Sequence, residues 1–327
     1  VYKRQAQDRV VVVLEPGYAD YETERRILAP LGVGVTAVGV KEDAVKALER
    51  LNPEAILVRE RRVDAACFDA APNLKAVVRY GVGVDNVDLS AARDRKIAVA
   101  NVPDYGAAEE VSDQAVALYL AVARRIVTRD AQVRAGGWDF GQREPIHGHR
   151  GGTLGLIGFG RIARRAREKF GALGFSRVLA FDPALTDEQA GSARVELADV
   201  DRICSDADLV SLHAPASPET AKMIDARRIR LMKPTAIIVN VARGELIDEA
   251  ALAAALREGR IFGAGLDVFA EEPPAPDNPL LALPNTVLSD HTGWYSEFSV
   301  RELQNKAAGE VARVLGGAAP EHWVNPW

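Results

Sequence analysis

The chain contains few of the residues that would assign it to a specialised class of protein. Only two of its 327 residues are cysteines, Cys67 and Cys204, which excludes a disulfide framework and a cysteine-rich zinc site. The longest apolar run, residues 115–123, is too short to cross a bilayer. The first residues are polar and lack the apolar segment of a signal peptide. We therefore expect a cytoplasmic protein that does not contact a membrane.

An excess of charge of one sign is also missing. Lysine and arginine (41 residues) nearly balance aspartate and glutamate (46 residues), for a net charge of −5. No basic surface for nucleic acid or for an anionic membrane is predicted. Apolar residues make up 48% of the chain, and its length is enough for two domains that each bury a core. Small metabolites and other proteins remain the expected partners.

Short apolar runs alternate with helical patterns along the whole chain. This alternation predicts βαβ units around parallel sheets, and the natural solution is a doubly wound α/β fold. The expected strands are 10–14, 55–58, 76–79, 98–102, 154–157, 178–181, 209–213, 237–241 and 263–266, with a short one beginning at Val287. The expected helices between them are 43–51, 162–173, 199–203 and 249–257.

Two long helical patterns, 107–127 and 296–315, resemble connectors between domains. If they carry the chain from one domain to the other, the last residues return to the first domain. We therefore expect one domain at 1–103, completed by 294–327, and a second domain at 104–293.

A glycine-rich loop follows the expected strand 154–157 and precedes a helix. Gly158 permits a tight turn, Gly160 lets the backbone approach a pyrophosphate, and Ala163 takes the third small position. Asp182 ends the next strand, where an acid accepts hydrogen bonds from a ribose diol and repels a 2′-phosphate. The pattern favours NAD over NADP. The alternative is a βα turn that binds no ligand.

Three further polar residues follow later strands, where ligands of open α/β sheets gather. Arg243 follows the strand 237–241, Glu272 lies in the loop after 263–266, and His291 follows Val287. Each alone has a plainer interpretation, as a surface charge, a solvated loop or a structural histidine. Together they supply an anchor for a carboxylate, a carboxylate partner and a proton donor.

At this point the sequence resembles the D-isomer-specific 2-hydroxyacid dehydrogenase family, over residues 50 to 316. The matching motifs are residues 81–88 (GVGVDNVD), 101–103 (NVP), the glycine loop, 213–215 (HAP), 240–245 (NVARGE) and 266–273 (LDVFAEEP). The resemblance implies two Rossmann-like domains with doubly wound parallel sheets, a flavodoxin-like substrate domain and an NAD-binding domain. It also implies a homodimer formed through the cofactor domain.

The resemblance assigns roles to individual positions. Arg243, Glu272 and His291 are the expected catalytic residues, and Val82, Gly83 and Trp294 the expected substrate contacts. The expected cofactor contacts are Gly158, Phe159, Gly160, Arg161, Ile162, Asp182, His213, Ala214, Pro215, Thr220, Val241, Ala242, Asp267 and Gly293.

The chemistry requires these residue types. Arg243 can pair with the carboxylate of a 2-oxo acid, and backbone amides near Val82 and Gly83 can complete the cradle. As an imidazolium, His291 can donate a proton to the ketone oxygen, while Glu272 raises the pKa of the histidine and fixes its tautomer. In the reverse direction neutral His291 acts as the base.

The residues after the histidine narrow the resemblance. Residues 294–297 (WYSE) are similar to the C-terminal-binding protein branch of the family, so Trp294 either lines the substrate pocket or packs at the start of a helix. Asp290 stands where the family usually has proline. Gln114 stands where many relatives have histidine.

Two other functions remain open. One is an NAD(H)-sensing binding protein or corepressor, but the intact trio favours catalysis. The other is phosphoglycerate dehydrogenase, which we expect less because the chain ends soon after His291. No metal is expected, since His147 and His149 in their glycine-rich segment are more typical of a surface turn. Cys67 and Cys204 are expected to be packing residues.

Overall fold

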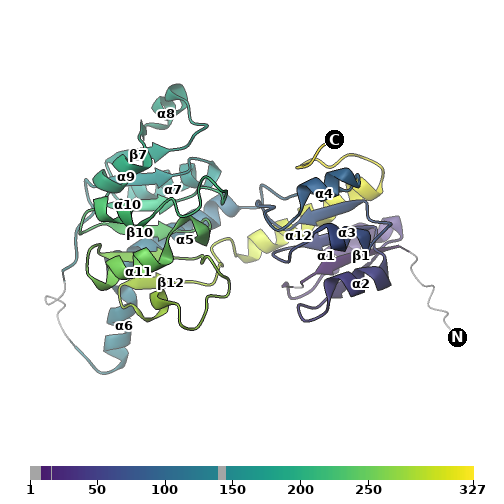
Figure 1. The fold of residues 1–327 in the computed structure, drawn as a ribbon, viewed down its shortest axis with the longest axis horizontal. Helices are drawn as coiled ribbons and strands as arrows, with labels where there is room; N and C mark the ends of the chain where they lie inside the picture. Colours follow the sequence, from purple (N-terminus) through teal and green to yellow (C-terminus); the bar gives the residue numbers. More distant parts are fainter. Residues whose placement is uncertain (1–8, 16, 139–144) are drawn as a thin grey trace. The chain divides into compact units, whose positions relative to one another are not determined.

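Two parallel β-sheets organise the chain, each in a separate compact unit (Figure 1). The computed structural model describes residues 9–15, 17–138 and 145–327. The terminal unit comprises Val1–Gly106 and Ser296–Trp327, and the central unit comprises Ala107–Tyr295. These bounds lie close to those expected from the sequence, while the functional role of each unit stays a prediction.

The terminal unit contains a five-stranded sheet of order β2-β1-β3-β4-β5, which is the flavodoxin-like order. Strands β1, β3, β4 and β5 are buried along nearly their whole length, because helices cover both faces of a parallel sheet. The strands are β1 (Val10–Leu14), β2 (Gly34–Val38), β3 (Ala55–Val58), β4 (Ala76–Arg79) and β5 (Ala98–Ala100). The helices are α1 (Glu22–Leu28), α2 (Ala44–Leu51), α3 (Ala65–Asp69), α4 (Leu89–Asp94) and α12 (Glu297–Leu315).

The central unit contains a seven-stranded sheet of order β12-β11-β10-β9-β6-β7-β8, all of it parallel. The strand order reverses at β6, which marks the point where such sheets bind ligands. The strands are β6 (Thr153–Ile157), β7 (Arg177–Phe181), β8 (Glu196–Leu197), β9 (Leu209–Leu212), β10 (Ile237–Asn240), β11 (Gly263–Leu266) and β12 (Thr286–Leu288). The helices are α5 (Ala107–Ala123), α6 (Ile126–Arg134), α7 (Arg161–Ala172), α8 (Asp187–Ala193), α9 (Val200–Asp206), α10 (Ala226–Leu231) and α11 (Glu249–Arg257).

Aspartate residues fix where many of the helices begin. In α2, α3, α4, α9, α10 and α11 an aspartate precedes the helix and its carboxylate accepts a backbone N–H of the first turn. Each cap of this kind stabilises a helix by about 1 kcal/mol relative to alanine. The doubly wound α/β architecture predicted from the sequence is confirmed, and these caps explain much of its local register.

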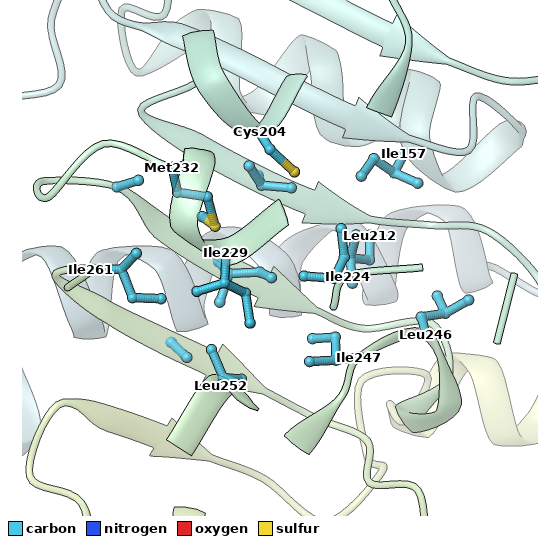
Figure 2. Close-up of a cluster of buried hydrophobic side chains, with 14 of the residues drawn as sticks. Ile157, Cys204, Leu212, Ile224, Ile229, Met232, Leu246, Ile247, Leu252 and Ile261 are labelled. Atoms are coloured by element: carbon cyan, nitrogen blue, oxygen red, sulfur yellow. The ribbon is translucent and has the colours of Figure 1, made fainter. Parts of the chain in front are cut away.

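A buried apolar cluster holds the helices α9, α10 and α11 against one face of the central sheet (Figure 2). Ile157 and Leu212 come from the strands, and Ile229 and Leu252 from the helices that cover them; each is at most 1% exposed. Truncating one such side chain to alanine costs about 2–5 kcal/mol. Cys204 lies in the same cluster, where burial raises the pKa of its thiol to about 12. The interpretation of this cysteine as a packing residue is confirmed.

The single helix expected over 107–127 is wrong. Helix α5 ends at Ala123, and α6 begins only at Ile126. Between them Arg125 adopts a left-handed conformation (φ 52°), and its guanidinium lies 4.8 Å from the centre of the Phe262 ring. Apolar residues stand directly on both sides of this break, at the end of α5 and the start of α6, so the pattern concealed the turn.

Several other expectations need smaller corrections. The strands expected at 98–102, 209–213 and 237–241 end one or two residues earlier. Strand β2 escaped prediction because only Val38 in it is buried, so it lacks an apolar run. His149 packs rather than lying in a surface turn: its ring stacks on Phe175 at 5.5 Å and bonds the Leu173 carbonyl.

Within the described residues, no helix combines the length and apolar character that a membrane span needs. In the same part of the chain, no three histidine, cysteine, aspartate or glutamate side chains gather as metal ligands.

Candidate active site

The glycine loop connects β6 to α7 at the carboxyl end of the central sheet. Gly158 has φ +87°, and a Cβ on it would lie 2.6 Å from the carbonyl carbon of His213, so only glycine fits there. A Cβ on Gly160 would meet nothing within 4 Å, which leaves the space beside the N-terminus of α7 open. A phosphate group fits such an open helix N-terminus.

Asp182 lies at the end of β7, directly beside this loop. Its Oδ2 accepts the Phe159 N–H at 2.8 Å, and its Oδ1 accepts the Ala184 N–H at 2.9 Å. The two bonds fix the carboxylate next to the glycine loop and leave lone pairs on both oxygens. The residues present therefore fit the ribose and pyrophosphate of a dinucleotide.

The other predicted cofactor residues follow further strands of the same sheet and reach the same edge. His213, Ala214 and Pro215 follow β9, Val241 and Ala242 follow β10, Asp267 follows β11 and Gly293 lies in the loop after β12. Thr220 closes its own loop by donating to the Pro215 carbonyl at 2.8 Å. Burial lowers the pKa of His213 to about 4, so its imidazole is neutral at physiological pH.

Arg243 lies in a tight turn after β10 that Asn240 shapes from within. The Asn240 amide donates to the Arg243 carbonyl at 2.8 Å, and its oxygen accepts the Ala242 N–H at 3.1 Å. A Cβ on Gly244 would lie 1.9 Å from the Phe269 carbonyl carbon. Only glycine allows this contact, which brings the Arg243 turn against the loop that carries Glu272.

Glu272 and His291 form the central contact of the site. His291 Nδ1 lies 2.6 Å from Glu272 Oε2, while Glu272 Oε1 accepts the Phe269 N–H at 2.9 Å. A carboxylate only accepts, so Nδ1 carries the hydrogen in this contact. Burial raises the pKa of Glu272, but the bonds from His291 and Phe269 and the charge of Arg243 outweigh it and hold that pKa below its ordinary value.

The backbone at His291 is strained. Its φ of +55° places a side chain with a Cβ in the left-handed region, at a cost of about 1–2 kcal/mol. The His291 N–H donates to the Asp267 carbonyl at 2.8 Å, which helps to hold that conformation. Strain of this kind persists where the surroundings enforce it and is common at functional sites.

Asp267 organises the loop that contains His291, a role the sequence did not reveal. Its carboxylate accepts Ser289 Oγ at 2.6 Å, the Gly293 N–H at 2.9 Å and the Thr292 N–H at 3.2 Å. Gln114 from α5 also reaches this group. The sequence drew attention to Gln114 as an unusual residue but gave no sign of its partners, because they lie more than 150 positions away.

Asp290, the residue beside the histidine, is exposed, and its Oδ1 accepts the Thr292 hydroxyl at 2.9 Å.

The predicted substrate contacts are Trp294, Val82 and Gly83. Trp294 is half-buried and packs edge-on against Tyr295, with ring centres 5.8 Å apart. Val82 and Gly83 belong to the terminal unit, where Asn101 donates to the Val82 carbonyl at 2.6 Å. Their contacts with substrate stay predictions.

Comparison with known proteins decides the family. The model of the D-isomer specific 2-hydroxyacid dehydrogenase NAD binding domain matches residues 116–293, more than half of the chain. A glyoxylate reductase from Korarchaeum cryptofilum is 38% identical over 266 residues, covering 80% of each chain. The chain belongs to the D-isomer specific 2-hydroxyacid dehydrogenase family. The family and the NAD-binding assignment predicted from the motifs are thus confirmed.

Other relatives agree with this family. A D-3-phosphoglycerate dehydrogenase from Methanocaldococcus jannaschii is 39% identical over 308 residues, 93% of this chain. The chain spans only 58% of that relative. A crystal structure of a protein from Thermus thermophilus has a TM-score of 0.85 at 35% identity, covering 96% of this chain and 99% of the other. The comparisons do not single out the C-terminal-binding protein branch, which stays a prediction.

Proposed function

We propose that the protein is an NAD-dependent oxidoreductase that interconverts a D-2-hydroxy acid and its 2-oxo acid. The observation that carries this proposal is the 2.6 Å contact between His291 Nδ1 and Glu272 Oε2, beside the Arg243 turn. Family membership and a glycine loop that fits a dinucleotide support it.

Each member of the trio has a separate task. Arg243 holds the substrate carboxylate by a charge-assisted pair. NADH, when bound, supplies the hydride that reduces the ketone carbon. His291 gives the proton on Nε2 to the ketone oxygen as negative charge develops there. Glu272 holds the imidazole by Nδ1 and stabilises its positive form.

The remaining predicted contacts complete the site in this proposal. Asp182 accepts hydrogen bonds from the adenosine ribose, and the glycine loop receives the pyrophosphate. Trp294 lines the side of the substrate pocket and favours an apolar or larger substituent on the 2-oxo acid. The half-buried position of Trp294 supports this assignment.

Oxidation of NADH against a panel of 2-oxo acids tests the proposal. Glyoxylate, hydroxypyruvate, pyruvate, phenylpyruvate and 2-oxo-4-methylthiobutyrate cover small, polar and apolar side chains. We expect turnover with at least one acid, and loss of it in Arg243→Gln through a raised KM. Tight NADH binding without turnover on any acid would instead favour an NAD(H)-sensing binding protein or corepressor.

A second candidate is phosphoglycerate dehydrogenase, which the name of the 39%-identical relative suggests. In the terminal unit Arg59 follows β3, at the same edge as Val82 after the neighbouring strand β4. The Arg59 guanidinium forms no ion pair with another described residue and could meet a second anionic group. Adding 3-phosphohydroxypyruvate to the panel tests this candidate. A preference for it that Arg59→Gln abolishes would support a phosphorylated substrate.

We also propose a homodimer formed through α6. Four apolar side chains on and after this helix are 52–79% exposed, namely Ile126, Val127, Val133 and Trp138. Apolar residues gathered in this way are typical of an interface. In Figure 1, α6 projects from the body of the central unit. Sedimentation should give a dimer that Val133→Asp dissociates.

A cytoplasmic location is the last part of the proposal. Cys67 and Cys204 are both unpaired, as in a reducing compartment. Fluorescence microscopy of a tagged chain in its native host should give a signal throughout the cytoplasm.

A further inference from the structure

Gln114 lies on α5, yet its side chain reaches the loop that carries His291. Its Nε2 donates to Ser289 Oγ at 2.8 Å and lies 3.5 Å from Asp267 Oδ1. Ser289 Oγ donates to Asp267 Oδ1 at 2.6 Å. Because the serine oxygen accepts the amide hydrogen, its own hydrogen is directed at Asp267. The hydrogen bonds of this network therefore all point the same way, from Gln114 through Ser289 to Asp267.

Three glycines allow α5 to approach this closely. One face of the helix presents residues four positions apart, and each faces a glycine of β11 or of the loop after β12. A Cβ on any of these glycines would lie only 2.6–3.1 Å from the facing side chain. The facing pairs are Gly263 with Val122, Gly265 with Leu118, and Gly293 with Gln114. Without the glycines, the helix would lie farther out and the Gln114 amide would not reach Ser289.

Asp267 transmits this contact to His291. The carboxylate, 2% exposed, binds the amides of Thr292 and Gly293, and the carbonyl of the same residue binds the His291 N–H. These bonds hold His291 at φ +55°, the conformation that directs its ring at Glu272. A rotation of the Asp267 side chain would release the loop and move the histidine.

We propose that Gln114 is a positioning residue for His291, acting through Ser289 and Asp267. The inference rests on the proposed function only in so far as His291 transfers the proton. Glutamine suits this positioning role because its amide is a donor at every pH. The direction of the hydrogen bonds from Gln114 to Asp267 therefore does not change with pH. The charged groups around the imidazole are Glu272, Asp267, the neighbouring Asp290 and, acting on Glu272, Arg243.

The first test compares two replacements of Gln114. Gln114→Leu keeps the volume and removes the donor, and we expect kcat to fall about 10- to 100-fold. Gln114→Glu donates to Ser289 only when protonated, so its kcat should fall further as pH rises. A role in packing alone would give a loss that does not depend on pH, and that result would overturn the proposal.

Two further variants serve as rescue and control. Ser289→Thr keeps the hydroxyl and should retain most activity, whereas Ser289→Ala should lose as much as Gln114→Leu. Gln304 is a matched control, since it is a buried glutamine on a helix of the terminal unit. Gln304→Leu should lower stability and leave kcat unchanged. If Ser289→Ala keeps the kcat of the wild type, the contacts from Gln114 through Ser289 to Asp267 do not position His291.

A readout independent of turnover separates this inference from the proposed function. The chain has five histidines, so the His291 ring resonance can be assigned by comparison with His291→Asn. In Gln114→Leu the NMR titration midpoint of His291 should fall, because a displaced ring loses contact with Glu272. If the wild type reduces no acid but this midpoint still shifts, the function is wrong and the positioning role stands. An unchanged midpoint together with an unchanged kcat would overturn the inference.

Discussion

Each unit contains a glutamate with a shifted pKa, and the two shifts are opposite: Glu24 is buried, whereas the side chain of Glu272 is 35% exposed. In the terminal unit Glu24 is fully buried and accepts the Tyr80 hydroxyl at 2.7 Å and the Gln304 amide at 3.2 Å. Burial outweighs these neutral donors and raises its pKa. In the central unit Glu272 meets His291 and the charge of Arg243, and its pKa is lowered although burial acts the other way.

The two shifts have opposite consequences for stability. The contribution of Glu24 is present below pH 4.5, its ordinary pKa, and is lost as pH rises through the raised value. The contribution of Glu272 is present above pH 4.5 and is lost as pH falls through the lowered value. Neutral donors thus leave the pKa of Glu24 raised, whereas cationic partners lower the pKa of Glu272. Asp267, whose pKa is also raised by burial, resembles Glu24 in this respect.

The largest effect should come from His291. In His291→Ala no group exchanges the proton, so kcat should fall about 10²- to 10⁴-fold while NADH binding is largely kept. Stopped-flow turnover and NADH fluorescence titration measure the two quantities. An equal loss of NADH binding would show that His291 belongs to the cofactor site instead.

Glu272→Gln should have the next largest effect, because it removes the charge and keeps a hydrogen-bond acceptor. Without the carboxylate the imidazolium is less stable, so the pKa of His291 should fall. Reduction needs the protonated form, and its rate at pH 8 should fall by about 10-fold. Oxidation needs the neutral form and should extend to lower pH. The pH midpoints of both directions should therefore move down together, and a midpoint that stays or rises in either direction would contradict the prediction.

Asp182→Asn keeps the size of the side chain at the end of β7 and removes its charge. The repulsion of a 2′-phosphate is lost together with a charge-assisted bond to the ribose. We expect kcat/KM to fall roughly 10-fold with NADH and to rise with NADPH, since charged hydrogen bonds contribute about 1.5–3 kcal/mol. If the ratio of kcat/KM with NADH to kcat/KM with NADPH is unchanged, Asp182 only anchors the Phe159 amide.

Glu24→Gln should have the smallest effect and should leave kcat unchanged. The variant cannot ionise, so its stability should not decline above pH 4.5 as that of the wild type does. At pH 4 the difference between the two should stay within about 1 kcal/mol, because a neutral hydrogen bond replaces another. Urea unfolding at pH 4 and pH 7 measures this. If the stability of both proteins declines in parallel above pH 4.5, Glu24 is not the cause of the decline.

Much of the fold and part of the site could be predicted from local patterns. Strands 10–14, 55–58, 76–79 and 263–266 appear with the expected bounds, because buried parallel strands are continuous apolar runs. The edge strand β2 and the break between α5 and α6 did not appear in the pattern. Edge strands bury little, and one left-handed residue does not interrupt an apolar period.

The sequence by itself determined the class of fold and the dinucleotide loop, and it predicted the trio Arg243, Glu272 and His291. These depend on residue type at short spacing, which the chain carries locally. Only the tertiary structure decided that Asp267 holds the loop of His291. It also decided that Gln114 reaches this loop, because three glycines let α5 pack closely on β11 and on the loop after β12. The contacts of Gln114 join positions more than 150 residues apart. Their geometry depends on how closely a helix packs on a strand, which no local pattern specifies.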